Sequence, residues 1–491
     1  MLTNVCSLRQ TTVIPDGLAS RAAASEPKGK SMTIADLAVV GGTVATDYGV
    51  FQANIAARDG KIVLIDEPGN PVPSARRVIN AEGLIVAPGG IDPHTHFQEP
   101  GPYDYREDFE TGTKSCAAGG VTTTLEHPLS VPPVRDAETF LAKRAVAEQK
   151  SVIDFGLWGG LLPETADSLE AMHALGAVAF KGFMLDSGEE YPWVDDGYLM
   201  SGLKTAKTLG AIIGVHAESE ALAAHEAERL RAAGREDGRA IAESRSPFSE
   251  YEAMARAILL AKETGSRLHI VHVSIADGVD LVQRARAEGV RVTAETCAHY
   301  LHFDWTALDK HGAYAKCKPP LRAPENTDAL WDHVLAGHLD FIASDHAPYT
   351  PAEKGRGIWD APWGMTGAQT MIPILISDGL IDRNWGLEAF VRFTSTNAAR
   401  TFGIYPRKGT IRIGSDCDLM LIDLESSWTV SSADLFSKQK WSLLEGETLK
   451  GRISYTVVRG QVVYEDGEIT ARPGYGGFIN PREISGQTER H

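Results

Sequence analysis

Two histidines close an apolar run near residue 90, with the spacing of a pair of metal ligands. The segment GLIVAPGGIDPHTHFQEPG, residues 83–101, has the pattern of a buried strand that ends at His94 and His96. Residues i and i+2 of a strand project from the same face, so both imidazoles can approach one cation. A lone histidine at a strand end is more often structural than a ligand, so a metal site needs further partners.

Other ionisable residues lie in similar strand-like segments. Lys181 lies in AVAFKGFM, and three further candidates follow in AIIGVHAE, RLHIVHVS and DFIASDHAP, namely His216, His272 and Asp345. Imidazole and carboxylate ligands without a thiolate suit zinc first, with manganese, iron and cobalt as alternatives. Lys181 does not fit as a plain ligand, because an ammonium has no lone pair and is costly inside an apolar strand unless neutralised or paired.

A scaffold of alternating strands and helices must position these residues. Seven strand-like segments follow the one that ends at His94, and helical stretches such as 136–149 and 251–265 separate them. Eight strands that each precede helical sequence predict an α/β fold, a (β/α)8 TIM-like barrel over residues 87–400. Such a barrel gathers its chemistry at the carboxyl ends of the strands, where the candidate ligands lie.

The two ends of the chain have a different pattern. Short strand-like runs separated by Gly, Asp and Asn fill residues 35–86, and the same pattern returns near the carboxyl end. We predict that residues 32–86 and 401–480 form one small β-sandwich domain, with the barrel inserted between them. Residues 1–31 lack the apolar core of a signal peptide and are expected to be a disordered extension, or an overlong start with Met32 as an alternative initiator.

Composition limits the partners and the compartment. The net charge of -17 disfavours nucleic acid and anionic membrane surfaces. Apolar runs end well short of the roughly 18 residues that a membrane-spanning helix needs. The five cysteines lack any CxxC pattern. This argues against a disulfide framework or a thiolate zinc site and favours a cytoplasmic protein.

Several motifs together point to a family. GGIDPHTHFQEPG, EDFETGTKSCAAGGVTTT, FKGFM, GVHAE, HIVHVS, KCKPPLR and SDHAP resemble the cyclic-amide branch of the amidohydrolase superfamily, which contains hydantoinases, dihydropyrimidinases, allantoinases and dihydroorotases. The resemblance extends from about residue 32 to residue 479. It implies hydrolysis of a ring C–N bond in a small cyclic amide. Because relatives are commonly tetramers or dimers, it also implies a homotetramer or homodimer.

The resemblance also gives the buried lysine a role. In this family the corresponding lysine reacts with CO₂ to form a carbamate that bridges two divalent metals. A hydroxide shared by the metals would attack the ring carbonyl, and the aspartate would pass its proton to the leaving nitrogen. Carried over residue by residue, the implied ligands are His94, His96 and Asp345 at the first metal, His216 and His272 at the second, and carboxylated Lys181 between them.

Three positions bear on which cyclic amide is the substrate. Gln98 replaces the arginine with which dihydroorotases hold a carboxylate, so dihydroorotase activity is not expected. Asp186 stands where dihydropyrimidinases and D-hydantoinases have a tyrosine that supports the oxyanion. Ala347 replaces the serine of the DHSP motif typical of allantoinases, although TLEHPLSVPPV, FGLWGGLLPE and KGFMLDSGEEYP resemble allantoinases and L-hydantoinases.

The predicted substrate contacts follow from these segments. The loop of residues 185–193 is the candidate for specificity, although its Tyr191 and Trp193 would equally serve to pack it against the barrel. Of the remaining histidines, a structural role is favoured for His127, and His346 is expected beside the metals rather than on them. His299 has either a structural or an orienting role. The predicted substrate-binding residues are Gln98, Phe183, Cys317, Lys318 and Ala347, and the family resemblance implies that Cys317 and Lys318 contribute backbone groups.

The sequence therefore predicts a binuclear metal-dependent hydrolase that opens a hydantoin-like or allantoin ring. A strict allantoinase, a dihydropyrimidinase and a non-catalytic relative are the alternatives within the family. A mononuclear deaminase is disfavoured by the buried lysine of FKGFM, because mononuclear deaminases do without a bridging carbamate.

Overall fold

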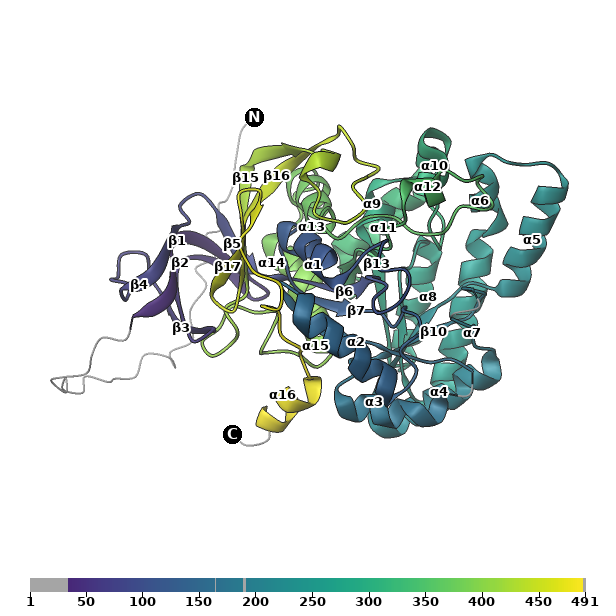
Figure 1. Ribbon diagram of the computed structural model, residues 1–491, viewed down its shortest axis with the longest axis horizontal. Helices are drawn as coiled ribbons and strands as arrows, with labels where there is room; N and C mark the ends of the chain where they lie inside the picture. Colours follow the sequence, from purple (N-terminus) through teal and green to yellow (C-terminus); the bar gives the residue numbers. More distant parts are fainter. Residues whose placement is uncertain (1–33, 164, 189–190, 489–491) are drawn as a thin grey trace, which may run out of the picture. The chain divides into compact units, whose positions relative to one another are not determined.

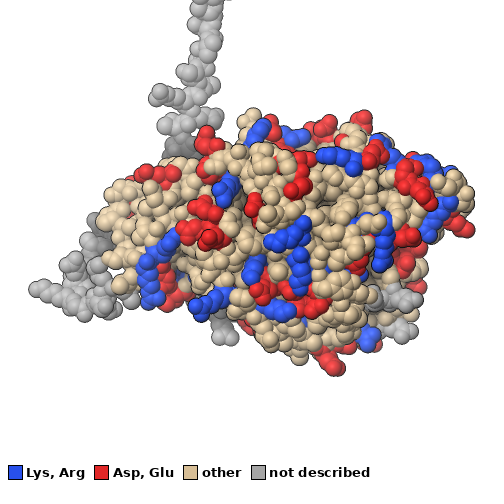
Figure 2. All heavy atoms as spheres, turned by 45° about the horizontal axis from the view of Figure 1, so that its top comes forward, with Lys and Arg blue, Asp and Glu red and all other residues tan. Residues whose placement is uncertain are grey.

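The computed structural model describes residues 34–163, 165–188 and 191–488 (Figure 1). The predicted extension of residues 1–31 lies outside this part of the chain. Among the described residues, no helix combines the length and the apolar character needed to cross a membrane. On the face drawn in Figure 2, acidic and basic side chains are interspersed with uncharged ones.

Both ends of the chain contribute to one nine-stranded sheet (Figure 1). Its order is β18-β17-β16-β15-β5-β1-β2-β3, with β4 beside β1. The antiparallel pair of β5 and β15 joins the amino-terminal strands to the carboxyl-terminal ones. The strands are β1 (Ala35–Thr46), β2 (Gly49–Arg58), β3 (Lys61–Asp66), β4 (Ala75–Asn80), β5 (Ile85–Pro88), β15 (Leu419–Thr429), β16 (Thr448–Val458), β17 (Gln461–Glu465) and β18 (Glu468–Ile469).

Between these ends the chain forms two parallel sheets, which confirms the predicted parallel α/β fold. A parallel bridge between Thr95 and His346 links the end of β6 to the segment that follows β14. The first sheet contains β6 (Gly90–Thr95), β7 (Val121–Glu126) and β8 (Asp154–Leu157). The second contains β9 (Gly159–Gly160), β10 (Phe180–Phe183), β11 (Ile212–His216), β12 (Arg267–Ile270), β13 (Val292–Cys297) and β14 (Phe341–Ala343).

Helices connect these strands, and their ends follow local capping chemistry. Asp136 forms a capping box at the start of α2, close to the predicted start. Helix α7 begins before the predicted residue 251, because Ser246 caps it and Pro247 occupies its first turn. The helices are α1 (Phe109–Ala118), α2 (Ala137–Lys150), α3 (Leu169–Leu175), α4 (Asp196–Leu209), α5 (Glu220–Ala232), α6 (Gly238–Ser244), α7 (Pro247–Thr264), α8 (Ala276–Ala287), α9 (Ala298–His302), α10 (Thr306–His311), α11 (Pro324–Ala336), α12 (Pro351–Lys354), α13 (Met371–Ile374), α14 (Leu387–Val391), α15 (Asn397–Thr401) and α16 (Pro481–Thr488).

A buried lysine ties the parallel strands to the terminal sheet. Lys408 Nζ lies 2.6 Å from Asp418 Oδ2 and 2.9 Å from Asp416 Oδ2, and it also contacts Asp154 of β8. Burial alone would lower the pKa of Lys408, but the three carboxylates raise it above its usual value. The ammonium thus occupies the centre of this acidic cluster, which is an ionic junction between the two parts of the fold.

Replacing Lys408 with methionine is expected to lower the free energy of unfolding by about 3–5 kcal/mol, because three buried carboxylates lose their common counter-charge. Lys61→Met is the matched control, since Lys61 pairs with the same Asp416 while its own side chain is 44% exposed. Lys61→Met should lower the free energy of unfolding by about 1 kcal/mol or less. Urea unfolding followed by circular dichroism measures both changes, and equal losses would contradict this role for Lys408.

Candidate active site

A cavity of about 300 Å³ lies at the carboxyl ends of the parallel strands. Lys181 enters it from β10 and His216 from the end of β11, while His272 follows β12 by two residues. Asp345 arrives from the segment after β14. All six residues that the resemblance implies as metal ligands line this one cavity, namely His94, His96, Lys181, His216, His272 and Asp345.

Three cavity residues have an unusual backbone conformation. Gln98, His272 and Asp345 have φ angles of 58°, 40° and 46° although none is glycine. Such conformations cost on the order of 1–3 kcal/mol each and persist only where the surroundings impose them. They cluster at active sites and ligand clamps, so their presence on the cavity wall marks it as a functional site.

Carboxylates behind the histidines orient the imidazole rings. His94 Nδ1 donates to Glu295 Oε1 at 2.6 Å, and His216 Nε2 donates to Glu218 Oε2 at 2.7 Å. Both glutamates are fully buried. Each hydrogen bond places the proton on one ring nitrogen and leaves the lone pair of the other nitrogen free, the arrangement of a histidine that binds a metal.

Several buried polar atoms at the site lack a protein partner. His94 Nε2, His96 Nδ1 and His272 Nδ1 accept or donate no hydrogen bond within the described part of the chain. The same holds for Lys181 Nζ among those residues. Burying a polar group without a partner costs free energy. Several unsatisfied atoms around one cavity therefore indicate that a bound group satisfies them.

The position of Lys181 is unfavourable for an unmodified ammonium. Its side chain is fully buried, and the ring of Phe183 lies 4.8 Å from Nζ. Burial lowers the pKa of Lys181 to about 8, although Asp345 and Glu295 act to raise it. Burial therefore weakens the preference of this lysine for its charged form, which fits a neutralised or modified lysine.

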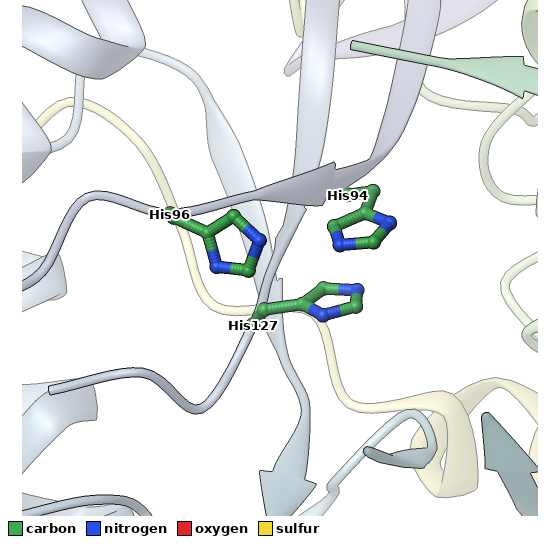
Figure 3. A group of neighbouring side chains, drawn as sticks. All are labelled: His94, His96 and His127. Atoms are coloured by element: carbon green, nitrogen blue, oxygen red, sulfur yellow. The ribbon is translucent and has the colours of Figure 1, made fainter. Parts of the chain in front are cut away.

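His127 lies beside His94 and His96 (Figure 3). His94, His96 and His127 each offer a nitrogen within 4.8 Å of the others. However, the rings of His127 and His94 are stacked, with centroids 3.7 Å apart and planes 6° apart. An imidazole binds a metal in the plane of its ring, and the lone pairs of two parallel stacked rings do not converge on one cation. His127 therefore packs against His94, and neither of its ring nitrogens has a hydrogen-bond partner among the described residues.

His346 and His299 also lie outside the lining of the cavity. His346 Nε2 donates to Glu107 Oε2 at 3.1 Å, and its Nδ1 accepts from the backbone N–H of Gly367. Both nitrogens are thus used away from the cavity, as expected for a residue beside the ligands. His299 lines a separate small cavity, where burial lowers its pKa to about 4 although the charge of Asp345 acts to raise it.

Four of the five predicted substrate-binding residues line the cavity: Gln98, Phe183, Lys318 and Ala347. Cys317 is not among the lining residues; its thiol is buried and donates to the backbone oxygen of Pro319, whereas the predicted contact involves its backbone.

The predicted specificity loop contributes unevenly. Tyr191 lines the cavity, but its hydroxyl donates to the backbone oxygen of Lys181 at 2.8 Å. Trp193 lies outside the lining and is 40% exposed.

Sequence reasoning missed two groups of residues. The orienting carboxylates Glu218 and Glu295 stand in the motifs GVHAE and RVTAETCAHY. Glu218 contacts His216 within its own motif, whereas the partner of Glu295, His94, is 201 residues away in the sequence. The second group forms the outer wall of the cavity and comes from two loops on either side of it. Its members are Tyr103, Arg106, Tyr349 and Trp363.

Comparisons with known proteins agree with this site. Residues 85–463 match the model of the amidohydrolase family. The allantoinase of Deinococcus radiodurans is 39% identical over 453 residues, which cover 91% of this chain and 99% of that protein. The L-hydantoinase of Paenarthrobacter aurescens is 35% identical over 91% of this chain and 98% of its own length. The solved L-hydantoinase (dihydropyrimidinase) from Arthrobacter aurescens matches with a TM-score of 0.89 at 35% identity, covering 91% of this chain and 100% of that one. The chain therefore belongs to the amidohydrolase family, which confirms the family and the hydrolase class expected from the sequence.

Proposed function

We propose that this protein hydrolyses a ring amide bond of a small cyclic ureide, either allantoin or a hydantoin. The observation that carries the proposal is the convergence of six side chains on one cavity, four of which carry a buried nitrogen without a hydrogen-bond partner among the described residues. Relatives named allantoinase and L-hydantoinase match over nearly their whole length, which supports this substrate class.

The cavity residues fit two divalent cations, zinc first and manganese, iron or cobalt as alternatives. Nitrogen and oxygen donors surround the cavity without a thiolate, and the buried amine of Lys181 is suited to carriage of CO₂ as a carbamate. Bound there, the cations would polarise the ring carbonyl and supply an activated water. The proposed ligands are His94, His96 and Asp345 for the first cation, His216 and His272 for the second, and carboxylated Lys181 for both.

Asp345 would move the proton that ring opening requires. Burial acts to raise its pKa, but the hydrogen bond from His96 and the neighbouring histidines hold it below the usual value. The carboxylate is therefore ionised at neutral pH and able to accept a proton from the attacking water. The same oxygen atoms can return that proton to the ring nitrogen as the C–N bond breaks.

Glu295→Gln is expected to weaken metal binding by about 10–100-fold, because the amide no longer accepts strongly from His94. Chelator competition on the purified protein measures this affinity. Glu250→Gln is the control: Glu250 is equally buried but pairs with Arg322 rather than with a histidine. The control should lose stability and keep its metal affinity. An unchanged affinity in Glu295→Gln would contradict the orienting role.

The alternative of a dihydropyrimidinase has less support. Asp186 lies in the exposed part of its loop, and its backbone N–H donates to Glu220. Tyr191 is the tyrosine of this loop that does line the cavity, and its hydroxyl is engaged with the backbone of Lys181. The family resemblance implies that dihydropyrimidinases stabilise the developing oxyanion with a loop tyrosine. Neither Asp186 nor Tyr191 presents a free phenol for that role.

We further propose that the two parallel sheets close into one (β/α)8 barrel over residues 87–400, and that residues 32–86 and 401–480 form a β-sandwich domain. The parallel bridge between Thr95 and His346 supports closure on one side. The hydrogen bond from Val178 N, just before β10, to Leu157 O at the end of β8 supports continuity on the other side. The TM-score of 0.89 to a solved hydantoinase agrees with this architecture.

The experiment that tests the function is a ring-opening assay on a small panel, with the metal content measured on the same sample. The panel contains allantoin, hydantoin, both enantiomers of a 5-substituted hydantoin, dihydrouracil and dihydroorotate. We expect turnover of allantoin or a hydantoin and none of dihydroorotate. A sample that holds two metals per chain and opens none of these rings would contradict the proposed substrate class.

A further inference from the structure

Arg106 reaches the outer wall of the cavity from the loop between β6 and α1. Its Nε and Nη2 atoms donate to Glu353 Oε1 at 2.9 and 2.7 Å, so its charge is balanced by a carboxylate of α12. Its guanidinium carbon lies 4.0 Å from the ring centre of Tyr103 and 4.7 Å from that of Tyr349. Arg106 therefore links its own loop to α12 at the cavity wall. Because its charge is already paired, it is not available as the counter-ion of a carboxylate substrate.

The same guanidinium fixes the orientation of Gln98. Arg106 Nη1 donates to Gln98 Oε1 at 3.1 Å. Because arginine has only donors, the amide oxygen of Gln98 must face Arg106, and the NH₂ group must face the other way. Gln98 lines the cavity, and its backbone at φ 58° holds the side chain there. The cavity wall at this point thus offers hydrogen-bond donors from a neutral group.

We propose that Arg106 is a positioning residue that holds Gln98 as a hydrogen-bond donor, so that this subsite selects a neutral ring bearing a carbonyl oxygen. This inference rests on the proposed function and specifies the chemical group of the substrate that the subsite binds. A substrate carbonyl would accept from the Gln98 NH₂ group. A carboxylate would instead meet the Arg106–Glu353 pair, whose charges already compensate each other.

A double-mutant cycle tests whether Arg106 acts through Gln98. Arg106→Met is expected to raise KM about tenfold for the substrate opened fastest, the equivalent of one hydrogen bond, with little change in kcat. Arg106→Lys, which still donates to Gln98, should recover part of this loss. In a Gln98→Met background, Arg106→Met should have no further effect on KM, because the amide that it positions is gone.

Two more measurements separate positioning from folding. Gln98→Glu keeps an acceptor for Arg106 but has no N–H to offer, so it should raise KM at least as much as Gln98→Met. The preference of the wild type for hydantoin over 2-thiohydantoin should shrink in Arg106→Met, since sulfur is the weaker acceptor. Thermal unfolding of each variant identifies any loss of structure.

The outcomes distinguish this inference from the proposed function. Additive effects of the two methionine variants on KM, or an unchanged KM in Arg106→Met, would overturn the inference while leaving the function standing. If the wild-type enzyme with its metals opens no ring on the panel, the proposed function fails and the inference falls with it.

Discussion

Lys181→Met should reduce kcat/KM for ring opening by about 10³-fold or more, because the site loses the group proposed to bridge both cations and stabilise the charge that develops beside them. Methionine fits an apolar, fully buried position, so the fold should be retained. Metal analysis of the folded protein should find fewer cations per chain than in the wild type. Kinetics and metal content are measured on the same preparation.

Lys143→Met is the matched control for Lys181→Met. Lys143 is also fully buried, but its Nζ lies 3.0 Å from Glu126 Oε1 in an ion pair. Its loss should lower stability and leave the metal content of the folded fraction unchanged. A Lys181→Met enzyme with near wild-type turnover and two cations per chain would show that the lysine has no part in the site.

Asp345→Asn should lower kcat by about 10²–10⁴-fold, the usual contribution of a positioned general acid–base group. Asparagine keeps the size of the side chain but cannot take up the proton of the attacking water. Steady-state kinetics together with metal analysis distinguish loss of proton transfer from loss of a ligand. Asp186→Asn, in the neighbouring exposed loop, should change kcat little, and equal losses in both variants would contradict the role given to Asp345.

Much of the site could be predicted because each candidate ligand stands at a fixed place in a strong local pattern. His94, His216 and Asp345 end or follow apolar strands, and the carboxyl ends of parallel strands meet at one edge. The parallel order of the strands, which the structure confirms, is what converts these separate sequence signals into one cavity.

The part of the site that could not be predicted depends on contacts between segments far apart in the sequence. Glu295 orients His94 only because β13 runs close to the end of β6, across 201 residues of chain. Arg106 meets Glu353 across 247 residues, between the loop that precedes α1 and the short helix α12.

The most direct test of the account is a metal titration of the metal-free enzyme in the presence of bicarbonate. Ring opening of allantoin and hydantoin is followed as zinc is added. The account predicts that activity rises with added zinc and levels off at two cations per chain, and that removing bicarbonate during reconstitution lowers the final activity. Full ring-opening activity in the metal-free enzyme, or none with two cations bound, would contradict a binuclear hydrolase of cyclic amides.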